Sequence, residues 1–158
     1  MKAASTKEIK TELTNLHPTQ LLDLCMQLTK YKKENKELLT YLLFEAHNEK
    51  SYIQEVTQLI DEEFKAVNKS NLYLAKKTVR KVLRTTQKHI KYSGIKQTEV
   101  ELLIYFCKKL QKSKIPLHAN TVLGNMYNRQ LLKIGKSMAT LHEDLQFDYS
   151  EDIKLLLG

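Results

Sequence analysis

The sequence contains no tryptophan and few of the residues that make turns: its 158 residues include four glycines and two prolines. All-β folds need frequent turns, so this shortage argues against them. It also leaves little material for the glycine-rich loops that hold phosphate groups. Hydrophobic residues make up 42% and charged residues 28% of the chain, which argues against disorder. The length suits one compact core, and we expect a single domain over residues 1–158.

Cysteine is also scarce, because Cys25 and Cys107 are the two in the chain. Two cysteines cannot build a disulfide framework, and both lie in apolar runs, where free cysteine behaves as a small hydrophobe. We therefore expect two core thiols and a reducing compartment. No window approaches the roughly 18 apolar residues that a membrane span needs, and Met1–Glu8 has no hydrophobic signal region. The sequence thus predicts a cytoplasmic, soluble protein with no membrane partner.

Apolar residues recur at spacings of three and four along the whole chain, which is typical of amphipathic helices. Ser5 with Glu8, and Thr98 with Glu101, have the spacing of a capping box at a helix start. The predicted helices begin at Ser5 and at Pro18, then cover about 34–47, about 51–68, Leu72–Tyr92, Thr98 to just before Ile115, about Asn120–His142, and a short segment from about Ser150. The fold class is therefore all-α, with seven or eight helices in antiparallel αα-hairpins that form an orthogonal bundle or a short solenoid-like array.

The net charge of +8 is concentrated in one stretch of the chain. Residues 64–98 contain ten lysines and arginines and no acidic residue, whereas the rest of the sequence is close to neutral or mildly acidic. The basic character of the protein, with a pI of about 9.3, therefore belongs to this stretch.

The helix over Leu72–Tyr92 separates this charge onto one face. On a helical wheel an apolar stripe predicted to face the core contains Leu72, Ala75, Val79, Val82, Leu83, Thr86 and Ile90. The adjacent sector, with Tyr73 among its members, holds the cationic ridge: Lys76, Lys77, Arg80, Lys81, Arg84, Lys88 and Lys91. The ridge belongs to a helix about 30 Å long, which has no acidic residue of its own.

Three interpretations of the cationic ridge remain open. It is a solvated helix face, partly compensated by the acids of the preceding helix, which are Glu55, Asp61, Glu62 and Glu63. Alternatively it binds an acidic protein surface, or it follows the phosphate backbone of a nucleic acid independently of sequence. Sequence-specific DNA reading is not expected, because the following helix offers mostly apolar and acidic side chains to base edges.

The patterns that carry catalysis or metal binding are missing. None of the histidines, His17, His47, His89, His118 and His142, has an acid or cysteine at a ligand spacing. His47 lies between Glu45 and Glu49, but a separation of two residues places it opposite both acids on a helix. Each histidine is expected in a surface or capping role, and buried thiols are inert. We expect no enzyme activity, no catalytic residue, no metal and no cofactor.

Two further features have structural and functional interpretations. Gly124 and Gly135 fall on nearly the same helix face, which indicates close packing within the chain or a homodimer contact. The segment Leu141–Tyr149 mixes acids with aromatics, and it either docks a partner or folds back onto the bundle.

The overall layout resembles a bacterial all-helical family of unknown function. The similarity rests on Lys7–Leu13, Leu16–Leu24, Tyr31–Glu37 and Leu74–Lys77, and it implies the fold class but no activity and no site residues. The residues themselves predict a non-enzymatic interaction module that presents the cationic ridge to an acidic protein partner, with nucleic-acid binding as the alternative.

Overall fold

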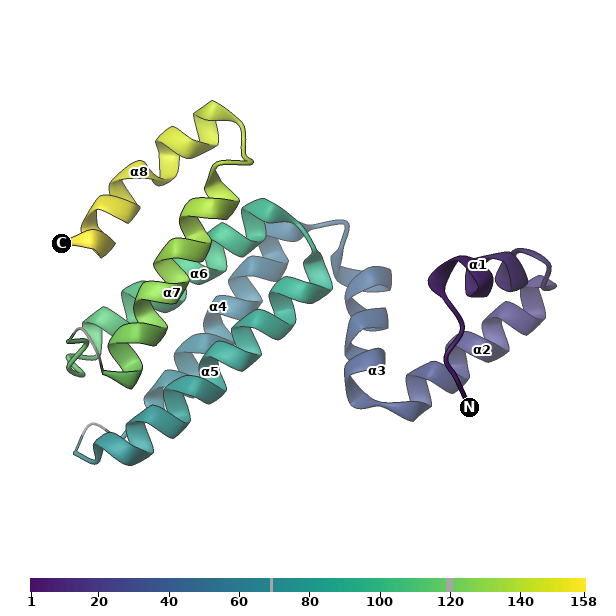
Figure 1. Ribbon diagram of the computed structural model, residues 1–158, viewed down its shortest axis with the longest axis horizontal. Helices are drawn as coiled ribbons and strands as arrows, with labels where there is room; N and C mark the ends of the chain where they lie inside the picture. The colour runs from purple at the N-terminus through teal and green to yellow at the C-terminus, as the bar shows by residue number, and fades with distance from the viewer. Residues whose placement is uncertain (69, 119–120) are drawn as a thin grey trace. The chain divides into compact units, whose positions relative to one another are not determined.

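The computed structural model describes residues 1–68, 70–118 and 121–158, and within these ranges the chain is all-α, as predicted (Figure 1). Eight α-helices and one short π-helix account for the regular structure of the described residues, which contain no strand. They are α1 (Thr6–Thr14), α2 (Pro18–Tyr31), α3 (Lys33–Thr40), η1 (Tyr41–Glu45), α4 (Glu49–Lys65), α5 (Leu72–Ser93), α6 (Lys96–Lys112), α7 (Val122–Met138) and α8 (Glu143–Leu157). The antiparallel hairpin arrangement stays a prediction.

The chain divides into two compact units, Met1–Phe44 and Glu45–Gly158. The first unit contains α1, α2 and α3, and the second contains α4 to α8. The expectation that residues 1–158 act as a single domain stays a prediction.

Two helix starts in the first unit are set by local features of the chain, as the sequence predicts. The Ser5 hydroxyl accepts from the Glu8 amide at 3.3 Å, and the Glu8 carboxylate accepts from the Ser5 amide at 2.7 Å. These reciprocal bonds form the predicted capping box. Pro18 begins α2 after His17, whose backbone is extended with ψ at 149°. These starts need no tertiary contact, which is why the sequence alone locates them.

The side chains of the first unit are more exposed than its apolar pattern predicts. None of the residues of α1, α2 and α3 is buried. Cys25 is exposed, so the prediction that it is a core thiol is wrong. Three short helices form too small a unit to enclose side chains, and amphipathic spacing alone therefore does not guarantee a core.

The predicted helix over 34–47 is also different in the structure. It divides into α3 and the π-helix η1, in which Tyr41 is buried at 4% exposure. Leu42 and Leu43 were expected inside but are 55% and 62% exposed, and Leu38 and Ala46 are exposed as well. A π-helical turn rotates side chains within it and after it relative to an α-helix, so the wheel that predicts burial no longer applies to Leu42, Leu43 and Ala46. Leu38 lies before this turn, in α3 of the first unit.

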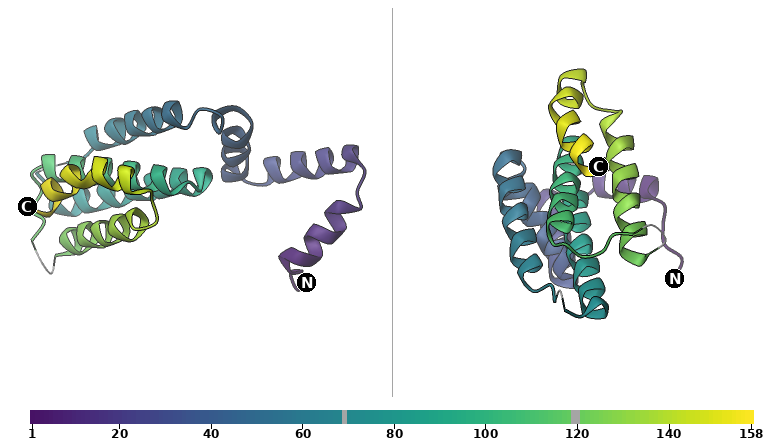
Figure 2. Two further views of the ribbon diagram at one scale, coloured as in Figure 1. Left: turned by 90° about the horizontal axis from the view of Figure 1, so that it is seen from above. Right: turned by 90° about the vertical axis from the view of Figure 1, so that its left-hand side faces the viewer.

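Helix α6 is the central element of the second unit. It packs against α4, α5, α7 and α8, and in both views of Figure 2 α4 and α7 lie on opposite sides of it. Its residues Leu102, Leu103, Phe106 and Leu110 have no exposed surface. Cys107 is equally buried, which confirms its predicted place in the core, and burial raises the pKa of this thiol to about 12. A thiol with this pKa stays protonated and inert.

Helix α5 has the boundaries and the buried face that its sequence predicts. Asn71 caps its start by accepting from the Tyr73 and Leu74 amides at 3.0 and 3.1 Å. Gly94 ends it in the left-handed conformation, with φ at 67°, which glycine adopts without strain. Six of the seven predicted core positions are buried, and Leu72, at 47% exposure in the first turn, is the exception.

The start of α6 differs from the prediction. The helix begins at Lys96 with Ile95 at the cap position, so the capping box of Thr98 and Glu101 does not form. Thr98 is instead buried inside the first turn, where its hydroxyl donates to Glu49 of α4 at 2.6 Å. The Thr98 hydroxyl therefore binds the carboxylate of another helix, and not the backbone amide of Glu101 that a capping box would require. The helix ends at Lys112, before Pro116, as expected.

The last two helices divide the C-terminal region differently from the prediction. α7 runs from Val122 to Met138, and the predicted start at Asn120 lies outside the described residues. His142 caps the next helix instead of ending this one, because its ring nitrogen accepts from the Asp144 amide at 3.3 Å. α8 therefore begins at Glu143 rather than near Ser150.

The two glycines of α7 have different surroundings. A Cβ at Gly124 would lie 2.1 Å from the backbone oxygen of His118, so this glycine permits close packing of the preceding loop. A Cβ at Gly135 would meet nothing within 4 Å. The expectation of internal packing is confirmed at Gly124, with loop backbone rather than a second helix as the neighbour. The homodimer contact through Gly124 and Gly135 stays a prediction.

Candidate interaction surface

The cationic ridge lies on α5, beside the stripe that packs against α4 and α6. Because all seven side chains come from one helix, the local periodicity that predicts the helix also places them together. Lys77, Arg80, Lys81, Arg84 and Lys91 are exposed. Lys76 and Lys88 are half-buried. Long basic side chains of this kind pack their carbon stems on the helix and keep the charge in water.

Most of the ridge has no acid beside it. Lys81 lies 3.8 Å from Glu63 of α4, and the Lys88 ammonium lies 6.0 Å from the centre of the Tyr92 ring. Among the described residues, the remaining cations form no ion pair; they are Lys76, Lys77, Arg80, Arg84 and Lys91.

Two of the four acids of α4 that the sequence offers as compensation, Asp61 and Glu62, are engaged elsewhere, and Glu55 is exposed and forms no ion pair among the described residues. Asp61 binds Lys109 and the Tyr105 hydroxyl, each at 2.7 Å. Burial by itself would raise the pKa of Asp61, but the hydrogen bonds from Lys109 and Tyr105 lower it below its usual value. Glu62 pairs with Lys65 at 2.6 Å on its own helix. Among the acids of α4, Glu63 is therefore the one that lies beside a ridge cation, Lys81.

A depression with a volume of about 590 Å³ runs along the ridge. It is lined by Tyr73, Lys76, Lys77, Arg80, Leu83, Arg84 and Gln87. Leu83 is 8% exposed and gives the depression an apolar base, while Tyr73 is 75% exposed at its edge. The sequence predicts the cations but not this hollow, because Leu83 belongs to the predicted core stripe. The surface therefore combines positive charge with an apolar contact point.

Two arginines occupy the middle of this surface. Arg80 and Arg84 are separated by one helical turn, about 6 Å along the axis. Each guanidinium offers a planar fork of donors that matches a carboxylate or a phosphate, and its charge does not titrate. An acidic group that lies within about one Debye length of the ridge is attracted by several of its cations at the same time. The arrangement can hold an anionic surface at several points.

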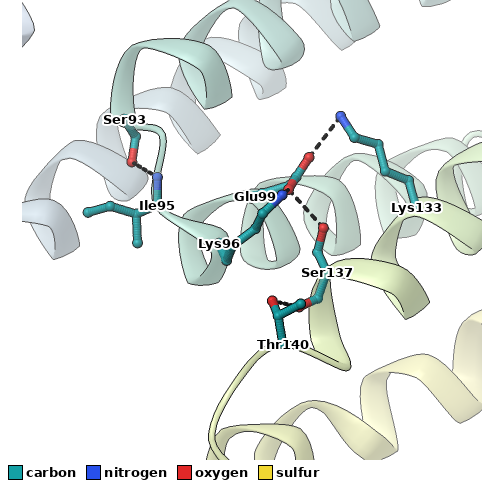
Figure 3. Close-up of polar contacts among 7 residues, drawn as sticks. All are labelled: Ser93, Ile95, Lys96, Glu99, Lys133, Ser137 and Thr140. Atoms are coloured by element: carbon teal, nitrogen blue, oxygen red, sulfur yellow. Dashed lines mark hydrogen bonds and ion pairs between the residues drawn. The ribbon is translucent and has the colours of Figure 1, made fainter.

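A second polar cluster, which sequence reasoning missed, joins the first turn of α6 to α7 (Figure 3). Glu99 is 5% exposed, and its carboxylate lies 2.8 Å from both the Lys96 and the Lys133 ammonium groups. The Ser137 hydroxyl donates to it at 2.8 Å. Burial by itself would raise the pKa of Glu99, but hydrogen bonds from Lys133, Lys96 and Ser137 lower it to about 2.

This carboxylate is a weak proton acceptor, because its charge is already balanced by two lysines. Its geometry therefore indicates a structural role, which is to hold α6 and α7 together. No signal in the sequence could have located it, since Lys133 and Ser137 are far from Glu99 along the chain and become neighbours only in the folded unit.

Two histidines lie at helix starts, where a capping role was expected, but His89 is half-buried inside α5 and does not take the expected surface or capping role. His17 and His142 lie at helix starts, and His89 contacts the Tyr52 hydroxyl at 2.8 Å. Within residues 1–68, 70–118 and 121–158, no group of three His, Cys, Asp or Glu side chains is arranged to hold a metal ion. In the same ranges, none of the helices is both long enough and apolar enough to cross a membrane.

Comparison with known proteins gives no match to a family model, to a curated protein or to a solved structure. This result is in keeping with a family of unknown function. The bacterial origin implied by the resemblance of the sequence stays a prediction.

Proposed function

We propose that this protein is a non-enzymatic interaction module that binds an acidic surface of another protein with the cationic ridge of α5. The observation that carries the proposal is the group of five cations on one helix face that form no ion pair among the described residues, four of which line the depression: Lys76, Lys77, Arg80 and Arg84. Charges that stabilise the fold are paired, as Glu99 and Asp61 are, whereas these cations are left available to a ligand.

The apolar base of the depression favours a protein partner over a nucleic acid. A phosphate backbone requires only cations along its path. The ridge adds Leu83 and the exposed Tyr73, which suit an apolar side chain flanked by carboxylates. Aromatic residues and arginines are the side chains that most often dominate protein interfaces.

A cytoplasmic location fits the same proposal. Cys25 is an exposed free thiol, which persists best in a reducing compartment. Asp61 and Glu99 are paired with lysines, and these contacts lower their pKa values. This supports a non-enzymatic character, since a catalytic acid or base needs a pKa near the working pH.

Binding of poly-L-glutamate, duplex DNA and single-stranded RNA to the purified full chain tests the proposal. We expect poly-L-glutamate to bind, with an affinity that falls as salt increases. Arg80→Glu with Arg84→Glu should weaken this binding about tenfold or more, because two attractions become repulsions at the centre of the ridge. Lys7→Glu with Lys10→Glu is the matched control, since it changes the net charge equally on exposed positions of α1.

Unchanged binding of poly-L-glutamate by the Arg80 and Arg84 variant would contradict the assignment of this surface. Tighter binding of DNA or RNA than of poly-L-glutamate, with a steep logarithmic dependence on salt, would replace the acidic protein partner with a nucleic acid.

A further inference from the structure

Helix α8 carries an exposed face whose chemistry is the opposite of the cationic ridge. Phe147 is 79% exposed and Leu155 is 70% exposed. Exposed acids share their arc on the helical wheel, and together they form the acidic–aromatic face: Glu143, Asp144, Phe147, Asp148, Glu151 and Leu155. The face therefore offers both negative charge and large apolar side chains to a partner.

The other side of α8 anchors the helix to the second unit. Leu156 is 2% exposed, and its backbone oxygen accepts from the Tyr127 hydroxyl at 2.8 Å. Asp152 pairs with Lys108 of α6 at 2.6 Å. Because this side of α8 packs against α6 and α7, the acidic–aromatic face on the other side is exposed to solvent.

Part of the acidity of this face is already compensated. Glu151 pairs with Lys154 at 2.8 Å, and Asp144 lies 3.3 Å from His142, which is a cation only when protonated. Glu143 and Asp148 have no ion pair among the described residues. The negative charge is therefore concentrated on either side of Phe147, in the first half of the helix.

The acidic–aromatic face and the ridge also have the same spacing. Arg80, Leu83 and Arg84 place an apolar residue three positions after one cation and directly before the next. Asp144, Phe147 and Asp148 repeat this spacing with acids in place of the cations. Two helices that cross at these points bring each carboxylate near a guanidinium and bring Phe147 to the apolar base of the depression.

One chain cannot make this contact with itself while its second unit stays folded. α8 packs mainly on α6 and α7, whereas α5 packs mainly on α4 and α6. Figure 1 and the right-hand view of Figure 2 show α5 and α8 on different sides of the unit. The two complementary faces are thus available to different molecules.

We infer that a second copy of this chain is a partner of the cationic ridge and docks the acidic–aromatic face of its α8 there. The inference rests on the proposed function, since it names an occupant for the same surface. The contact joins two different surfaces, so a pair of copies keeps one free α8 face on the first copy and one free ridge on the second. Such a contact produces a closed ring or an open chain of copies rather than a symmetric dimer.

Sedimentation velocity of the full chain over a range of concentrations tests this inference. At about 20 mM NaCl the average mass should rise with concentration above the 18.5 kDa of one chain, and at about 500 mM NaCl it should return to one chain. Arg80→Gln with Arg84→Gln should abolish the association, and so should Asp144→Asn with Asp148→Asn. Lys7→Gln with Lys10→Gln and Glu12→Gln with Asp23→Asn are the controls for lost charge, and both should associate like the wild type.

A mixture of the two non-associating variants is the decisive experiment. The first variant retains an intact α8 face and the second retains an intact ridge, so together they can form one complete contact. An equimolar mixture should give a species of twice the monomer mass and nothing larger. Phe147→Ala in the first variant should abolish this species, because it removes the apolar group from the contact.

The outcomes separate this inference from the proposed function. Wild type that binds poly-L-glutamate but stays monomeric at low salt would overturn self-association and leave the proposed function standing. A mixture that stays monomeric while the wild type associates would show that other surfaces join the copies, which also overturns the inference. If wild type neither associates nor binds poly-L-glutamate, both proposals fail.

Discussion

Substitution of Glu99 measures how much its contacts with Lys96 and Lys133 contribute to the free energy of unfolding. Replacing Glu99 with glutamine keeps the shape of the side chain and removes its charge, so the attraction to Lys96 and Lys133 is lost. A pKa that falls from 4.5 to about 2 on folding corresponds to about 3 kcal/mol at neutral pH. Because the two lysine side chains are 58% and 42% exposed, solvent screening reduces this to about 2 kcal/mol.

The same cluster predicts a pH dependence with a definite sign. The pKa of Glu99 is lower in the folded than in the unfolded chain, so its contribution to stability is complete above about pH 4.5 and disappears as the pH falls towards 2. The stability difference between wild type and Glu99→Gln should therefore be largest at neutral pH and shrink over this interval. Other carboxyl groups titrate in both proteins and cancel in the difference.

Urea denaturation followed by far-ultraviolet circular dichroism, at several pH values between 7 and 2.5, measures this difference. Glu62→Gln is the control, because Glu62 and Lys65 are 67% and 70% exposed and such a pair contributes about 0.5 kcal/mol or less. The reasoning is refuted if Glu99→Gln is as stable as the wild type at pH 7, or if the difference stays constant down to pH 2.5.

Two further predictions follow from packing. Gly124→Ala should lower the free energy of unfolding by about 1–3 kcal/mol, because its Cβ meets loop backbone at 2.1 Å, whereas Gly135→Ala, which meets open space, should raise it by up to about 1 kcal/mol. Thermal denaturation compares the two variants, and equal effects would contradict the packing described for Gly124. Iodoacetamide should label the exposed Cys25 of the native protein and reach the buried Cys107 only after denaturation. Mass spectrometry counts the labels, and native labelling of Cys107 would show that its helix opens readily.

The cationic ridge was predictable because every residue in it belongs to one helix. The 3.6-residue period that places Val79, Val82 and Thr86 in the core also places Arg80 and Arg84 outside. The start and end of α5 were equally local, since Asn71 and Gly94 act on neighbouring backbone groups. What the period could not show was whether acids of α4 would neutralise the ridge, because that depends on which of them Lys109 and Tyr105 hold.

The sequence by itself determined the helical class, several helix ends and the position of the excess charge, because these depend on residues within one or two turns of each other. Tertiary structure alone decided that Glu99 is ionised between α6 and α7, that Thr98 donates to Glu49 instead of capping, and that Cys25 is exposed. Each of these depends on groups that are distant along the chain or on the size of the unit that surrounds the side chain. Spacing within a helix carries no information about either.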